Sequence, residues 1–142
     1  MKKLIEKHRK LGLKVTPQRL AILKYLDGNK NHPSAEDIFR EIKKEYPTVS
    51  FATVYNTLQA LRDKGEINEV TIDWEKKHYD PNPKPHHHII CTECNKIGDV
   101  FKDYSEALRL PGNIAEEFKP VRNHINFYGV CRDCQKKEKR RN

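Results

Sequence analysis

Four cysteines, arranged as two identical pairs, constrain this chain more than any other feature. The pairs are Cys91 with Cys94 and Cys131 with Cys134, and the chain has no other cysteine. Two such turns can place four thiolates around one tetrahedral Zn2+ at about 2.3 Å. The spacing therefore predicts a structural zinc site, and one or two redox-active dithiols are the alternative. The 36 intervening residues exceed the roughly 15–20 of a simple zinc ribbon, so we expect a folded segment whose ends the zinc ties together.

The composition narrows the class of protein. Lys and Arg number 28 against 20 Asp and Glu, a net charge of +8. Leu, Ile, Val and Phe form about 23% of the chain, just above the roughly 20% below which chains are disordered, so the core is lean and a metal or partner subunit is expected to stabilise it. No apolar run approaches the roughly 18 residues of a membrane span, and the N-terminus does not resemble a signal peptide. We expect a basic, soluble, cytoplasmic protein.

Residues 1–65 predict four helices. Thr16 before Pro17, Ser34 with Asp37, and Ser50 have the pattern of helix starts. The apolar residues expected to face the core of the third and fourth helices are Ile38, Phe39, Ile42, Tyr46, Phe51, Val54, Leu58 and Leu61. Residues 67–72 alternate at period two, a polar turn follows at 73–77, and 78–79 begin a second strand. Helices followed by a two-stranded ribbon predict a winged helix-turn-helix DNA-binding domain over residues 1–80.

The second half predicts a different kind of domain. Residues 81–85 include three prolines and predict a stiff hinge. Strands are expected at 86–90, 97–101 and 121–130, a partial helix at 104–118 that is broken at Pro111, and a frayed basic tail at 136–141. The predicted fold class is α+β, with residues 86–142 as a second, metal-binding domain.

The fourth predicted helix carries candidate contacts to nucleic acid. Its outward-facing positions hold a small residue, hydroxyls and an amide that can reach base edges in a major groove. The candidates, with flanking cations for phosphate, are Lys14, Arg19, Ser50, Ala52, Thr53, Tyr55 and Asn56. Arg62 and Lys64 are further cations near this face. The alternative is an ordinary solvated helix face.

A histidine run directly precedes the first cysteine pair. On a strand, His86 and His88 project to one face and His87 to the other. Asp80 and Asp99 are oxygen donors able to join the first two. Such a sulfur-free set suits Fe2+ or Mn2+ better than tetrahedral zinc. A solvated histidine run with surface aspartates is the alternative.

Several segments together resemble the ferric uptake regulator (Fur) family, in the family order and over essentially the whole chain. They are residues 16–19 (TPQR), 32–37 (HPSAED), 52–56 (ATVYN), 86–94 (HHHIICTEC) and 128–131 (YGVC). The resemblance implies a homodimeric, metal-dependent transcriptional repressor with a winged-helix domain, an α/β dimerisation domain and an AT-rich pseudo-palindromic operator. It assigns the structural zinc to Cys91, Cys94, Cys131 and Cys134, and a regulatory Fe2+ or Mn2+ to His32, Asp80, His86, His88 and Asp99.

Three positions resemble the peroxide-sensing branch of that family. Asp80 and Asp99 stand where iron sensors usually have Glu, and Asn56 where they often have Arg. The branch implies that bound Fe2+ reacts with hydrogen peroxide, oxidising a ligand histidine and ending repression, which is one turnover and not enzymatic catalysis. An iron or manganese availability regulator without peroxide chemistry is the alternative. A metal-trafficking protein or metal-dependent hydrolase is a third reading, and a hydrolase is disfavoured because five protein ligands leave little room for substrate.

Three residues depart from the family pattern. Asn95 replaces the usual Gly after the second cysteine, which would alter the knuckle turn. Pro85 and Asn123 stand where some iron sensors have histidine ligands of a further site. We therefore do not expect a third metal site formed by His87, Glu106 and His124.

Overall fold

The computed structural model describes residues 2–71 and 77–141. For residue 141 it describes the backbone alone. The chain separates into two compact units, residues 1–83 and 84–142, which are described in turn. Within the described residues, no helix combines the length and the apolar character needed to cross a bilayer.

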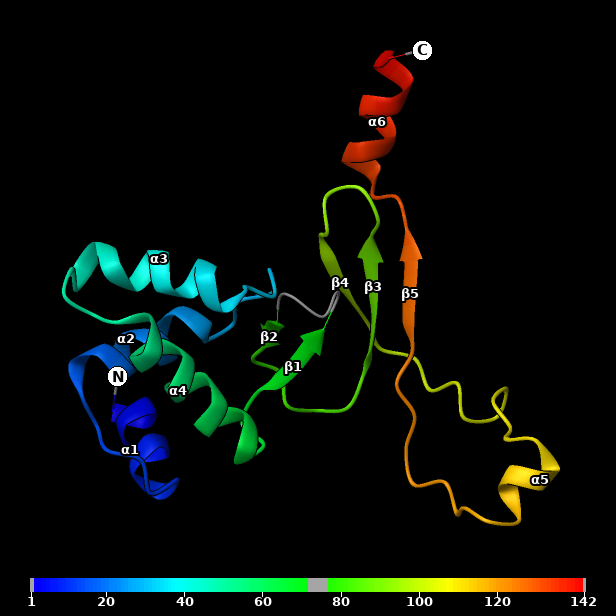
Figure 1. Cartoon of the computed structure of the whole chain (residues 1–142), viewed down its shortest axis with the longest axis horizontal. Coiled ribbons are helices and arrows are strands. Elements are labelled where there is room, and N and C mark those ends of the chain that lie inside the picture. The colour runs from blue at the N-terminus through cyan, green and yellow to red at the C-terminus, as the bar shows by residue number, and fades with distance from the viewer. Residues whose placement is uncertain (1, 72–76, 142) are drawn as a thin grey trace. The chain divides into compact units, whose positions relative to one another are not determined.

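In its described residues the first unit contains four helices, labelled α1 to α4 in Figure 1. They are α1 (Lys2–Lys10), α2 (Pro17–Leu26), α3 (Ala35–Glu45) and α4 (Phe51–Asp63). Three of them begin at a side chain that caps the first turn, because the Thr16, Ser34 and Ser50 hydroxyls each accept a backbone N–H three residues later. The four predicted helices and these three caps are therefore present.

The core of the first unit lies between α2, α3, α4 and the strands that follow. Ile22, Ile38, Val54 and Leu58 are fully buried within one continuous apolar cluster. Phe51, expected to face this core, is instead 40% exposed, and its ring packs at the surface against the rings of its neighbours Phe39 and Tyr55. Its position in the first turn of α4 places it at the edge of the apolar stripe.

The two-stranded ribbon consists of β1 (Asn68–Thr71) and β2 (Lys77–Asp80), paired antiparallel with Asn68 opposite Asp80. Most of the turn predicted between them lies outside the described residues, although Lys77, placed in that turn, belongs to β2. Tyr79 fixes β2 to the helices, because its ring is fully buried and its N–H donates to the carbonyl of Pro33 at 2.9 Å.

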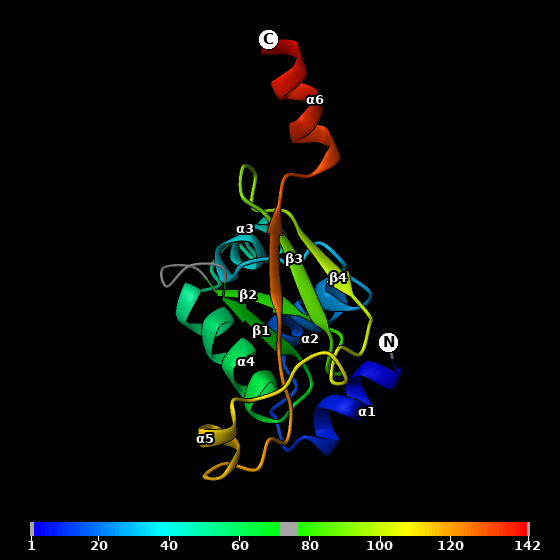
Figure 2. The ribbon, with the colours of Figure 1, turned by 90° about the vertical axis from the view of Figure 1, so that its right-hand side faces the viewer.

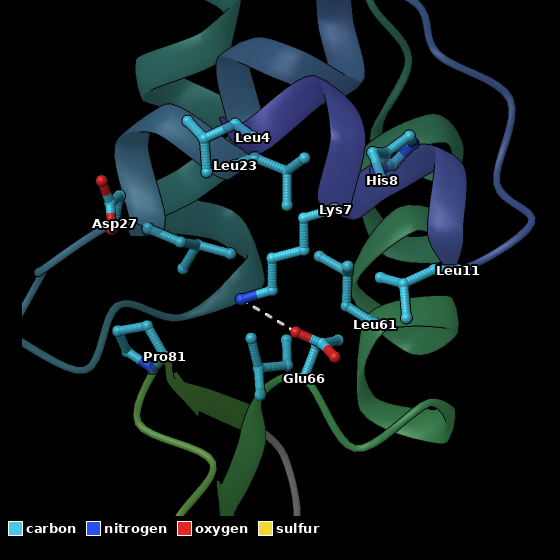
Figure 3. Close-up of a pocket in the computed structure, with 11 residues that line it drawn as sticks. Leu4, Lys7, His8, Leu11, Leu23, Asp27, Leu61, Glu66 and Pro81 are labelled. Carbon is cyan, nitrogen blue, oxygen red and sulfur yellow. Dashed lines mark ion pairs between the residues drawn. The ribbon is translucent and has the colours of Figure 1, made fainter. Parts of the chain in front are cut away.

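A small cavity of about 60 Å3 lies beneath α1 (Figure 3). Leu4, His8 and Leu11 line it from α1, and Lys7 at its rim forms a 2.9 Å ion pair with Glu66. The His8 ring is fully buried and its Nε2 lies 3.1 Å from the carbonyl of Lys14. Among the described residues, none offers a hydrogen-bond partner to Nδ1 of His8. The polar imidazole of His8 is thus buried where α1 packs mainly through apolar side chains.

The described residues of the second unit form a three-stranded sheet, whose strands β3, β4 and β5 are labelled in Figure 2. Its order is β4 (Ile97–Val100), β3 (His87–Cys91), β5 (Asn126–Gly129), with β4 antiparallel and β5 parallel to the central strand. The helices are α5 (Gly112–Ala115) and α6 (Arg132–Arg141).

Two expectations for this unit were wrong, and a third was met only in part. The partial helix expected within 104–118 is limited to the four residues of α5, which begins directly after Pro111, because a proline disfavours helical backbone at the residue before it. The strand expected over 121–130 covers only β5, where β3 offers a partner. The tail expected to be frayed is the regular helix α6, because its Lys, Glu, Gln and Arg residues are strong helix formers and Cys134 anchors its first turn.

Candidate functional site

The four cysteines lie together in the second unit. Each offers a sulfur, and the four sulfurs all lie within 4.8 Å of one another. Four sulfurs at 2.3 Å from one tetrahedral ion stand about 3.8 Å apart. The Sγ atoms of Cys94 and Cys131 are 3.7 Å apart, and all four cysteines are free of disulfides. The donor set and its spacing fit a tetrahedral zinc ion.

The sheet brings the two cysteine pairs together. Parallel pairing places Cys91, the last residue of β3, opposite Gly129 of β5, two residues before Cys131. In the first knuckle Asn95 has a φ of +63° and its N–H donates to the carbonyl of Cys91 at 3.0 Å. Asn accepts this left-handed conformation more readily than most residues, so the turn forms without the usual Gly.

The electrostatics of the cluster favour a bound cation. The N–H of Cys131 donates to Sγ of Cys91 at 3.3 Å, and this and neighbouring backbone N–H groups lower the pKa of Cys91 to about 6. Hydrogen bonding to the Cys131 thiol, together with burial, raises the pKa of Cys134 to about 12. Four adjacent thiolates repel one another, and a divalent cation removes that conflict.

The first unit holds two of the five expected regulatory ligands side by side. His32 and Asp80 are almost completely buried, with His32 Nε2 3.3 Å from Asp80 Oδ2. His32 lies in the connection between α2 and α3 with a φ of +50°, a conformation uncommon for a residue other than Gly. Its carbonyl accepts from Nδ1 of His78 at 2.9 Å, so β2 holds both ligands.

The second unit holds the other three. His88 pairs with Asp99 across β3 and β4, and Oδ1 of Asp99 lies 2.8 Å from His86 Nε2 and 3.4 Å from His88 Nε2. His86 Nδ1 donates to the carbonyl of Lys84 at 2.7 Å, which keeps its Nε2 on the side of Asp99. Each unit therefore presents imidazole and carboxylate groups together, without sulfur.

His87 faces away from this group, as strand alternation predicts. Its Nδ1 accepts the N–H of Ile125 at 3.0 Å. No cluster of three or more such ligands among the described residues includes His87, Glu106 or His124.

One contact at this site involves a residue, His124, that sequence reasoning did not connect with His88. Nε2 of His124 lies 3.0 Å from Nδ1 of the expected ligand His88. The residues are 36 positions apart, and only the parallel β3–β5 register brings them together. A strand register of this kind has no local sequence signal.

Helix α4 presents some of the expected nucleic-acid contacts and not others. Ala52, Thr53 and Asn56 are exposed, whereas Tyr55 is half-buried and its hydroxyl accepts from Lys77 Nζ at 3.3 Å. The Ser50 hydroxyl is engaged in capping α4.

The flanking cations also differ from one another. Lys14 is exposed, and its carbonyl accepts from the half-buried Arg19 guanidinium at 2.9 Å. Arg62 is engaged by Glu69 at 2.6 Å and by Asp63 at 3.1 Å, so it is a poorer phosphate ligand than its charge suggests, while Lys64 is exposed.

The comparisons of the sequence and of the structure with known proteins agree on one family. The model of the ferric uptake regulator family matches residues 10–128. The peroxide-responsive repressor PerR of Staphylococcus aureus (strain Mu50 / ATCC 700699) is 37% identical over 130 residues, covering 91% of this chain and 87% of that protein. The structure resembles the iron-containing ferric uptake regulator of Francisella tularensis (TM-score 0.72, 35% identity, 87% of this chain and 96% of that one). It also resembles the peroxide stress regulator of Campylobacter jejuni (TM-score 0.65, 33% identity, 94% and 97%).

These similarities confirm the resemblance seen in the sequence, the α+β fold class and the expectation of a regulator in place of an enzyme. With a family model covering most of its length and relatives above 30% identity, the chain belongs to the ferric uptake regulator family.

Proposed function

We propose that this protein is a metal-dependent, dimeric DNA-binding repressor that senses hydrogen peroxide. The observation that carries the proposal is the pair of sulfur-free ligand groups, one on each unit. His32 and Asp80 belong to residues 1–83, and His86, His88 and Asp99 to residues 84–142.

In this proposal the two metals have separate roles. Cys91, Cys94, Cys131 and Cys134 hold Zn2+, which stabilises the second unit. The three imidazoles and two carboxylates hold Fe2+ or Mn2+, ions for which nitrogen and oxygen ligands are suitable. Because the five ligands come from both units, binding this ion fixes the angle between the DNA-binding and dimerisation domains and so controls DNA affinity.

The residues around the regulatory ion also account for peroxide sensing. When bound, Fe2+ supplies the redox chemistry that activates hydrogen peroxide. One oxygen atom of the peroxide is added to the imidazole of a ligand histidine, and the other leaves as water. The oxidised His32 is a poorer ligand, so the ion is lost and repression ends with it. Asp80 and Asp99 in place of Glu favour this branch, and an iron or manganese availability regulator is the second candidate.

Helix α4 is the proposed reader of DNA. Its exposed Ala52, Thr53 and Asn56 are suited to base edges, while Lys14 and Arg19 are the proposed phosphate contacts. A homodimer would match an AT-rich pseudo-palindrome with half-sites about one helical turn apart. The second unit leaves large apolar side chains exposed, including Phe118 (62%) and Val121 (87%), which supports its assignment as the dimerisation domain of a cytoplasmic regulator.

Mass spectrometry of the Fe2+-loaded protein after a brief, low dose of hydrogen peroxide tests this proposal. The tryptic peptide from Asn31 to Arg40 contains His32 and no Met, Cys or Trp. We expect this peptide to gain one oxygen with Fe2+ and none with Mn2+, which serves as the matched control. An unmodified peptide from a protein whose DNA binding still depends on Fe2+ would refute peroxide sensing through His32 and favour the availability regulator.

A further inference from the structure

His124 makes a contact that no role proposed above uses. Its Nε2 lies 3.0 Å from Nδ1 of His88, and the two ring centroids are 5.3 Å apart. The other nitrogen of His88, Nε2, faces Asp99 at 3.4 Å. The His88 ring thus has one nitrogen toward the proposed metal ligand Asp99 and the other toward His124.

The backbone beside His124 holds it in this place. The next residue, Ile125, donates its N–H to His87 Nδ1 at 3.0 Å and accepts the N–H of His88 at 3.2 Å with its carbonyl. These two bonds come from consecutive residues of β3 and fix the chain immediately after His124. The contact with His88 is therefore built into the β3–β5 pairing.

The chemistry of imidazole determines what this contact can do. A neutral imidazole carries one proton, so a His88 ring that binds a metal through Nε2 carries its proton on Nδ1. Metal-binding histidines almost always donate that proton to an acceptor, which fixes the tautomer and the ring orientation. His86 donates to the carbonyl of Lys84 at 2.7 Å. For His88 the group in that place is the imidazole of His124.

We propose that His124 is a positioning residue for the metal ligand His88. It accepts the Nδ1 proton of His88 on its own Nε2, carries its own proton on Nδ1, and thereby keeps Nε2 of His88 directed at the regulatory ion. Since the His124 Nε2 lone pair is engaged by His88, His124 is not itself a ligand of that ion. The inference rests on the proposed regulatory site and adds a determinant of its affinity.

The test measures Mn2+ binding by the full-length, zinc-loaded protein, using the electron paramagnetic resonance signal of free Mn2+. The His124→Ala variant removes the acceptor, and we expect about 10–100-fold weaker Mn2+ binding, the usual cost of losing an outer partner of a ligand. His124→Gln supplies an amide oxygen as acceptor and should recover most of the affinity. Asn123→Ala, at the exposed neighbouring position, is the matched control and should bind as the parent does.

A second readout separates positioning from a general structural effect. In the Co2+-loaded protein, the hyperfine-shifted Nδ1 proton of His88 should exchange with water faster in His124→Ala than in the parent and in Asn123→Ala. Zinc content and far-ultraviolet circular dichroism check that each variant is folded.

Three outcomes would overturn the inference. If His124→Ala binds Mn2+ within twofold of the parent while His88→Ala does not bind it, the role of His124 is refuted and the proposed regulatory site stands. Equal losses in His124→Gln and His124→Ala refute a role as hydrogen-bond acceptor. Undiminished Mn2+ binding by His88→Ala refutes the proposed site itself, and the inference with it.

Discussion

Loss of one zinc ligand should unfold the second unit and leave the first folded. The two units differ in what stabilises them. The continuous apolar cluster runs from Ile22 to Tyr79 and belongs entirely to the first unit. Among the described residues of the second unit, the buried apolar side chains are Ile90 and Ile97, together with two of the cysteines. We therefore expect Cys94→Ser to affect the two units unequally.

The magnitude follows from the size of the two contributions. Structural zinc contributes roughly 10–16 kcal/mol to folding in zinc-finger peptides at neutral pH. A whole domain is usually stable by only about 5–15 kcal/mol. The free energy of zinc binding is thus as large as the stability of an ordinary domain. A site that has lost one thiolate no longer supplies it in full, and the small sheet of the second unit cannot replace what is lost.

Two-dimensional 1H–15N NMR of the full chain provides the assay. For Cys94→Ser we expect dispersed amide signals from residues 2–71 and collapsed, random-coil signals from the second unit. Glu93→Gln, at the exposed neighbouring position, serves as the control and should retain the full spectrum. A zinc-free Cys94→Ser protein with dispersed signals from β3, β4 and β5 would refute the reasoning, as would simultaneous loss of signals from both units.

Two further predictions concern His8 and Asp99. Burial lowers the pKa of His8, so the unfolded chain takes up a proton at higher pH than the folded protein does. The stability that this adds is present above about pH 6.5 and is lost as the pH falls below it. Chemical unfolding at pH 7.5 and 5.5 should therefore show a smaller loss of stability on acidification for His8→Leu than for the parent, and equal losses would contradict this. Asp99→Glu should keep metal-dependent DNA binding but make it less sensitive to peroxide. An unchanged peroxide response in a gel-shift titration would show that Asp99 does not determine this sensitivity.

The local features of the fold were the ones that sequence could predict. A helix cap depends on a few adjacent residues, and Thr16, Ser34 and Ser50 act as caps where their patterns indicate. The spacing of the cysteines likewise predicts a tetrahedral site, because each short pair already brings two sulfurs together in one turn. Strand alternation was enough to separate His87 from its two neighbours.

The features that depend on pairing between distant residues were not predictable in the same way. The start of β5 is set by where β3 offers hydrogen-bond partners, and the sequence from Val121 onward does not reveal it. The same register brings His124 to His88. The helical tail differs for another reason: its charge is typical of a solvated chain end, but its Lys, Glu, Gln and Arg residues also have high helix propensity.

Strand β3 links two kinds of chemistry through one register. Its first residues neighbour the imidazole group, its last residue is the zinc-site Cys91, and the same pairing with β5 positions Cys131 and His124. A slip of β5 by two residues would displace both together. We therefore expect the two metals to load in order: the thiolates acquire Zn2+ first, and the strand register that this fixes then completes the surroundings of His88. A chain deprived of zinc would lose its regulatory affinity without any change to the regulatory ligands themselves.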